Sequence, residues 1–323
     1  MIYSEEKWNN AGEIKAFVKV SGSLSFKVMS TPLREALELF IVPLVGEEMA
    51  GRLQEVYAAT ERIAEEQRAL ELAQRANAYL ALWYDFDEIN TRITDAGFQR
   101  QESENGSFTQ AYKYQEDNLR NNFRNKGWNA VDSLLDYLEA NVRLFPEYEK
   151  APAHEVRSSD LVKSTAEVDS FYCINHSRII FMRLQNHFRF VTQMVLPSVI
   201  GQSLFERLNA NLAASEDGGL EKLRRQTLGF VVLSAVKRLM AETGSVTDRG
   251  LYFKSVTDKE GNERVQPVDD SRLSLQLDNI QCDIDRYQAA LERYVKRYFP
   301  DGYKGGRKDV FTRDNDHKSI FFA

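Results

Sequence analysis

Residues 40–53 read FIVPLVGEEMAGRL, and residues 194–208 read MVLPSVIGQSLFERL. In both stretches an apolar run contains a proline, and a glycine and a helix-like stretch follow it. Pro43 matches Pro197 at an offset of 154 residues. Similarity within one chain at a fixed offset is the sequence signature of repeated structural units. This pair of stretches therefore decides how the rest of the chain is interpreted.

The same offset recurs elsewhere along the chain. The further matched positions are Gly46 with Gly201, Asp95 with Asp248, Gly97 with Gly250, and Pro146 with Pro300. Their offsets lie between 153 and 155 residues, and their order is kept. The sequence therefore predicts two tandem repeats of one unit, over residues 1–150 and 151–303, followed by a C-terminal tail over 304–323.

Each repeat is expected to be a helical bundle. Seven prolines and seventeen glycines are few for 323 residues, and long stretches are rich in residues that favour helices. The apolar and polar alternation over residues 14–28 predicts a short extended start, after which Thr31 caps a helix with Pro32 at its first position. The longest helix of the first repeat is predicted over 61–88. The apolar run 228–236 predicts a central buried helix in the second repeat.

A small β-hairpin is predicted in each repeat after a T-D-x-G turn. Asn105-Gly106 lies between polar alternating flanks, as in a type I′ turn, and Gly261-Asn262 occupies the matching tip. The T-D-x-G sequence itself indicates a turn, since Asp can bond the backbone and Gly accepts positive φ. The expected fold class is mainly α with minor β: two tandem helical-bundle repeats, each with a small β-hairpin.

Sequence motifs of catalysis, cofactor binding and metal binding are missing. There is no P-loop, G-x-G-x-x-G, G-x-S-x-G or H-E-x-x-H. The acidic run WYDFDEIN, at 83–90, is not repeated and is interpreted as a solvated helix end. Cys173, His176 and His187 are loosely spaced and lack the fourth ligand of a structural zinc site. We expect no catalytic residue, no cofactor and no metal; an enzyme with its site in a cleft between the repeats is the alternative.

Charge and hydropathy restrict the partners and the location. The formal net charge of −6 gives no general attraction to nucleic acid or to an anionic membrane. The longest apolar run, residues 40–45, is far shorter than the roughly 20 residues that span a bilayer. The first ten residues lack the pattern of a signal peptide. The expected location is the cytoplasm, or a virion, with no membrane or nucleic-acid partner.

The order of these features resembles a family of uncharacterised proteins from Bacteroides-type bacteria and their prophages. That order is an extended start, a helix broken at P-x2-3-G, a long Ala/Leu helix, a T-D-x-G turn with a hairpin, and closing helices. Members of the family look like virion-assembly components. The unit is similar in outline to the small head-to-tail connector, or adaptor, proteins of tailed phages, and it departs from them by being duplicated.

The resemblance implies a non-enzymatic structural protein that binds portal or tail components of a virion, or that self-assembles. A cellular adaptor or scaffold with another partner is the alternative. Hairpin tips and chain ends can add strands or helices to a neighbour. The residues expected at partner contacts are therefore Asn105, Gly106, Gly261, Asn262, Phe321 and Phe322.

Overall fold

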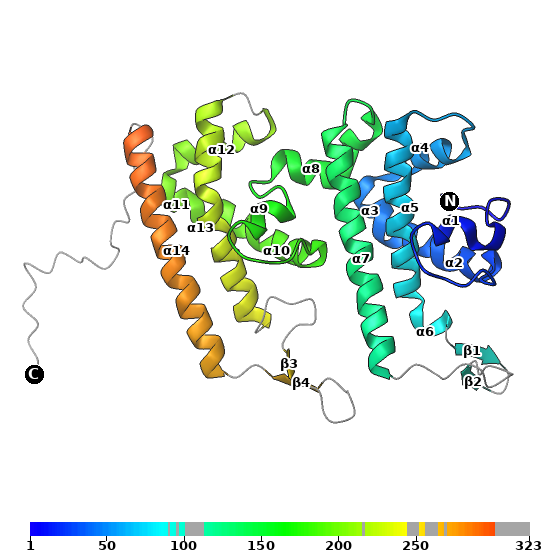
Figure 1. Cartoon of the computed structure of the whole chain (residues 1–323). Coiled ribbons are helices and arrows are strands. Elements are labelled where there is room, and N and C mark those ends of the chain that lie inside the picture. The colour runs from blue at the N-terminus through cyan, green and yellow to red at the C-terminus, as the bar shows by residue number, and fades with distance from the viewer. Residues whose placement is uncertain are drawn as a thin grey trace, which may run out of the picture. The chain divides into compact units, whose positions relative to one another are not determined.

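Figure 1 shows a computed structural model of the chain, and the fold is mainly α-helical. The structure describes residues 1–89, 91–94, 97–100, 113–214, 217–243, 252–255, 264–267 and 270–300. The chain divides into two compact units. Unit 1 comprises Met1–Arg157, Ile174–Ile180 and Tyr252–Pro267, and unit 2 comprises Ser158–Cys173, Phe181–Leu251 and Val268–Ala323. None of the described helices is both long and apolar enough to cross a membrane.

The first half of the chain is built on two long helices that pack along each other, α5 and α7 (Figure 1). Its helices are η1 (Asn9–Ala11), α1 (Gly12–Lys15), α2 (Phe26–Ala36), η2 (Leu37–Ile41), α3 (Val42–Val45), α4 (Glu47–Ala58), α5 (Ala64–Tyr84), α6 (Phe86–Ile89), α7 (Lys113–Ala140), η3 (Pro146–Lys150) and α8 (Pro152–Ser159). α2 and α4 also pack against α5. α5 is therefore the central helix of unit 1.

In the second half, α13 packs along α14 and against α12. Its helices are α9 (Thr165–Asp169), α10 (Arg178–Phe190), η4 (Val191–Val195), α11 (Leu196–Ile200), α12 (Gln202–Ala214), α13 (Gly218–Thr243) and α14 (Asp270–Tyr298). Within the predicted central run 228–236, every residue is buried apart from the half-buried Ser234. The prediction of a central buried helix is confirmed.

Two short antiparallel strand pairs follow the central helices. β1 (Thr91–Thr94) pairs with β2 (Gly97–Arg100), and β3 (Tyr252–Ser255) pairs with β4 (Arg264–Pro267). Thr94 lies opposite Gly97, so only two residues join β1 to β2, as in the tightest hairpins. Asn105-Gly106 therefore does not join this strand pair. Asn105, Gly106, Gly261 and Asn262 lie outside the described residues.

The predicted extended start over residues 14–28 is wrong. Ile14 and Val18 are both buried and are four residues apart, which places them on one face of a helical turn rather than on a strand. Thr31 is not a helix cap, because α2 already begins at Phe26. Pro32 lies inside α2, where it cannot donate a backbone hydrogen bond.

The two proline–glycine stretches form similar breaks in the backbone. In the first, η2 is a π-helix, Pro43 lies in the first turn of α3, and Gly46 has φ 82° and ψ 157° before α4 begins. In the second, η4 is a π-helix of the same length, Pro197 lies in the first turn of α11, and Gly201 has φ 89° and ψ 142° before α12 begins. Each π-helix with its proline and glycine is called an elbow below.

Glycines allow the paired long helices to approach closely. A Cβ atom on Gly127 of α7 would lie 2.8 Å from Leu80 of α5. A Cβ atom on Gly229 of α13 would lie 2.5 Å from the ring of Tyr287 on α14. In each helix pair, a large side chain of one helix thus packs against a glycine of the other. The glycine lies on the second helix of the pair α5–α7 and on the first helix of the pair α13–α14.

Candidate functional site

The residues that the sequence singled out are only partly described by the structure. Asp95, Asp248, Gly250, the tail 304–323 with Phe321 and Phe322, and the two expected hairpin tips lie outside the described residues. Gly97 begins β2, Pro146 begins η3, and Pro300 is exposed after α14. The elbows are therefore the sequence-predicted features whose surroundings can be analysed.

The loose Cys173, His176 and His187 pattern does not form a metal-ligand set. No three His, Cys, Asp or Glu side chains within the described part of the chain are grouped so that they could hold a metal ion. Cys173 is exposed, and His187 Nε2 lies 3.6 Å from a carboxylate oxygen of Glu242. This geometry indicates a weak surface pair.

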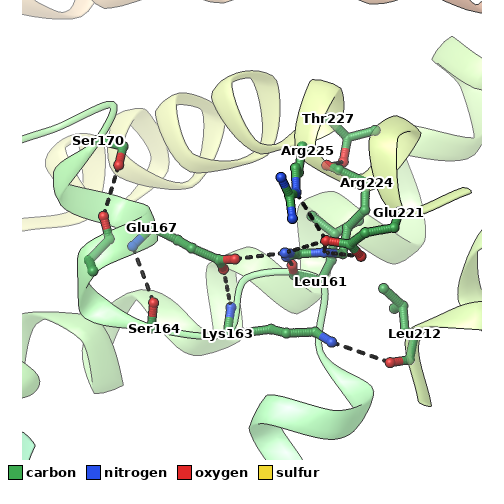
Figure 2. Close-up of polar contacts among 11 residues, drawn as sticks. Leu161, Lys163, Ser164, Glu167, Ser170, Leu212, Glu221, Arg224, Arg225 and Thr227 are labelled. Atoms are coloured by element: carbon green, nitrogen blue, oxygen red, sulfur yellow. Dashed lines mark hydrogen bonds and ion pairs between the residues drawn. The ribbon is translucent and has the colours of Figure 1, made fainter. Parts of the chain in front are cut away.

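A dense polar cluster of unit 2 surrounds Arg224 (Figure 2). The Arg224 guanidinium donates to the backbone carbonyl of Leu161 at 2.7 Å, to Glu167 at 2.8 Å and to Glu221 at 3.0 Å. Glu167 also accepts from the backbone N–H of Lys163 at 2.6 Å. A buried arginine is stable when its donors are paired in this way.

These contacts hold the segment before α9 against the start of α13. Ser164 caps α9 by accepting from the backbone N–H of Glu167 at 3.2 Å, and the Lys163 ammonium donates to the carbonyl of Leu212 at 3.3 Å. The dashed lines in Figure 2 join polar groups of the chain to one another across this cluster. The arrangement is a structural clasp.

A second charged cluster lies along one face of α7 in unit 1. Asp132 pairs with Arg178 at 3.1 Å, with both side chains buried, and Glu139 pairs with His154 at 3.0 Å. Asp136, between these two carboxylates, pairs with Arg157 of α8. The three carboxylates are three or four residues apart and therefore share one helix face.

Burial governs the titration of this cluster. It lowers the pKa of the Arg178 guanidinium, and the nearby Asp132 charge acts in the opposite direction. It raises the pKa of the Tyr148 hydroxyl well above its ordinary range, because the phenolate would be desolvated. The charges are matched by neighbours in the same unit. Like the Arg224 clasp, this cluster joins parts of the fold, here α7, α8 and the segment 174–180.

The first elbow carries an exposed aromatic patch, defined here as Leu39, Phe40, Trp83 and Tyr84. Leu39, in the π-helix, is 51% exposed, and Tyr84, at the end of α5, is 46% exposed. The Phe40 ring lies 5.4 Å from Trp83 and 5.5 Å from Tyr84, centroid to centroid. Trp128 of α7 is buried beneath it, 5.9 Å from Phe40. Tyr and Trp dominate binding energy at protein interfaces, so this is a candidate partner-binding surface.

Acidic side chains border the aromatic patch. Asp85 follows Tyr84 directly and is buried, so the interpretation of this run as a solvated helix end is wrong for Asp85, whereas Asp87 and Glu88 are exposed. Its pKa is raised by burial and further by the charges of Glu88 and Glu35. Asp85 and Glu88 thus follow the aromatic pair closely along the chain, and Asp87 between them pairs with Arg120 at 3.0 Å.

The second elbow carries a patch of opposite character, the cationic patch, defined as Phe190, Met194, Lys237 and Arg238. Met194, in the π-helix, is 68% exposed, and Phe190 is 40% exposed. The Arg238 guanidinium lies 3.9 Å from the centroid of the Phe190 ring. Lys237 precedes it on α13 and donates to Gln281 of α14 at 2.6 Å. Arg238 and Phe190 thus share one surface, with Met194 one turn after Phe190 and with Lys237, half-buried, next to Arg238 in the sequence.

The two patches occupy corresponding places in the sequence. Met194 lies 154 residues after Phe40, and Lys237 and Arg238 lie 154 residues after Trp83 and Tyr84. Neither patch was predicted, although the proline–glycine stretches pointed to the elbows themselves. The structural feature that marks both patches is the π-helix, which is often found at functional positions, and the sequence contains no signal for it.

The fold and these surfaces define a class: a mainly α-helical protein of two compact units, each with an exposed apolar patch at an elbow. Residues 41–158 match the family described as "Family of unknown function (DUF6712)". The match begins at the last residue of η2 and includes α3 to α7 and nearly all of α8. No curated protein and no solved structure matches the chain.

Proposed function

We propose that this chain is a non-enzymatic assembly protein that binds its partners through the two elbow patches. The single observation that supports this most strongly is the exposure of large apolar side chains in both π-helices, Leu39 and Met194. Exposed aromatic and aliphatic groups clustered beside charges are typical of protein interfaces. The elbows hold these side chains on rigid helices, which reduces the entropy lost on binding.

We further propose that the two halves are tandem copies of one helical unit with a small hairpin. η4 begins 154 residues after η2 and has the same length, and α13 begins 154 residues after α5. The elbow glycines Gly46 and Gly201 share the same positive-φ backbone. Two linked copies would raise the effective concentration of the second contact once the first had formed.

The specific role that we propose is that of a phage or prophage virion component that joins head and tail, with portal or tail proteins as partners. The resemblance in the order of sequence elements supports this role, and the paired elbow patches supply the surfaces that it requires. Such a protein works by contact and needs no reaction.

The proposed role is tested by mass spectrometry of phage particles purified after prophage induction in the source organism. We expect the chain to be present in complete particles at a few to a few tens of copies. If complete particles lack it, the virion role is wrong, and affinity purification from the same cells would then test the alternative of a cellular adaptor.

A further inference from the structure

We propose that the aromatic patch of one copy of this chain binds the cationic patch of a second copy, so that copies associate head to tail. The inference rests on the assembly function proposed above and specifies one partner, which is the chain itself. It follows from the chemistry of the two patches, which complement each other.

The complementarity begins with charge. Acidic side chains lie close to the aromatic patch along the chain, with Asp85 directly after Tyr84 and Glu88 three residues further on, whereas Lys237 and Arg238 belong to the cationic patch. A negative surface that meets a positive surface associates faster and in a defined orientation. Both patches also offer exposed apolar area, so the contact would gain from burial as well as from charge.

The aromatic rings themselves favour cations. Lysine and arginine are attracted to the faces of Trp and Tyr rings, and Trp is the strongest of these partners. Trp83 is half-buried and Tyr84 is exposed, so their rings offer surface for such contacts. Arg238 already lies over the ring of Phe190 in its own unit, which shows the same pairing within one chain.

Symmetric contacts between identical patches are disfavoured by the same charges. Two aromatic patches face to face would bring together the carboxylates of Glu35, Asp85 and Glu88, and two cationic patches would bring together Lys237 and Arg238. Like charges at an interface cost several kcal/mol. The contact is therefore between unlike patches, and each copy carries one patch of each kind. Contacts of this heterologous type close into rings or extend as filaments.

Charge reversal of each patch tests the proposal. The full-length chain is analysed by analytical ultracentrifugation over a concentration series, beside the double variants Glu35→Lys/Glu88→Lys and Lys237→Glu/Arg238→Glu. We expect the wild-type chain to form oligomers, and each double variant to associate at least about a hundredfold more weakly, since like charges then face each other.

Mixing the two variants gives the decisive measurement. One variant has two negative patches and the other has two positive patches, so neither associates alone. An equimolar mixture restores every contact as a pair of opposite charges, and we expect it to form oligomers in which the two variants alternate. A tag on one variant then retains the other variant.

The control is Arg207→Glu/Lys222→Glu, which reverses two exposed cations of unit 2 outside the patch. It should associate like the wild type, and circular dichroism should show that all variants remain folded. A wild-type chain that stays monomeric, or a mixture that fails to associate, overturns the proposal. Either result leaves the virion role intact, because that role is tested separately by the presence of the chain in particles.

Discussion

At the scale of single residues, Asn77 is a polar side chain in a core that is otherwise mostly apolar. It lies in the middle of α5 and is fully buried, and neither its side-chain oxygen nor its nitrogen has a hydrogen-bond partner in the described part of the chain. The residue 154 positions later in α13 is Val231, which is equally buried. A buried polar group without partners lowers stability.

Replacement of Asn77 by valine should stabilise unit 1. We expect Asn77→Val to raise the free energy of unfolding by about 1 kcal/mol, because the buried amide no longer has to be desolvated. Urea unfolding followed by circular dichroism measures this change. The reciprocal variant Val231→Asn should lower the stability of unit 2. A loss of stability in Asn77→Val would mean that the amide has a partner or a functional role.

At the scale of elements, the elbow glycines set the direction of the chain. Gly46 combines φ 82° with ψ 157°, a conformation that only glycine adopts readily. We expect Gly46→Ala to destabilise the protein by about 1 to 3 kcal/mol through backbone strain. The thermal midpoint measured by calorimetry checks this value.

Gly51 provides the matched control for that substitution. It lies exposed within α4, and a Cβ atom there would have no neighbour within 4 Å. Gly51→Ala should therefore stabilise the protein by about 0.5 to 1 kcal/mol, because alanine favours the helix. Equal effects of the two substitutions would exclude backbone strain at Gly46 as the cause.

The Arg224 clasp, an element of unit 2, should make stability depend on pH. Burial alone would raise the pKa of the Glu221 carboxyl, but hydrogen bonds and charges from Arg224 and Arg225 outweigh it, so the pKa lies below its ordinary value of 4.5. A carboxyl with a lowered folded pKa stabilises the fold above its unfolded pKa, and this contribution is lost as the pH falls through the folded value.

Glu221→Gln should remove this part of the pH dependence. We expect the variant to be less stable than the wild type at neutral pH and to lose less stability between about pH 5 and about pH 3. Urea unfolding at a series of pH values measures the difference. Glu206→Gln, on the exposed surface of α12, is the control and should follow the wild-type curve.

How far the sequence predicts these elements depends on the physical signal of each one. The long apolar run of α13 and the proline–glycine breaks give strong local signals, and both are found where expected. The π-helices are not predictable in this way, because one extra residue in a helical turn leaves no pattern of its own. Trp83 is not predictable as part of a surface patch either, since a large aromatic side chain suits a core and an interface equally well.

The scale of the whole molecule adds connections that no local pattern contains. Residues 174–180 belong to unit 1 although residues 158–173, which precede them, belong to unit 2. Arg178 is buried within that returning segment and pairs with Asp132 of α7. Residues 174–180 therefore contribute to the stability of unit 1.

Loss of the Arg178 charge should destabilise the full-length chain. We expect Arg178→Met to cost about 3 to 5 kcal/mol, because it removes one partner of a buried ion pair. The double variant Asp132→Leu/Arg178→Met should recover most of this loss, since no buried charge of the pair remains. Urea unfolding of the three proteins measures both effects. A double variant no more stable than Arg178→Met would rule out the ion pair as the cause.

The division of the chain into two units also separates its natural optical and chemical labels. All three tryptophans, Trp8, Trp83 and Trp128, lie in unit 1, and both cysteines, Cys173 and Cys282, lie exposed in unit 2. Tryptophan fluorescence therefore reports on unit 1, and a dye attached to the thiols reports on unit 2. The wild-type sequence thus allows the unfolding of each unit to be followed separately in one sample.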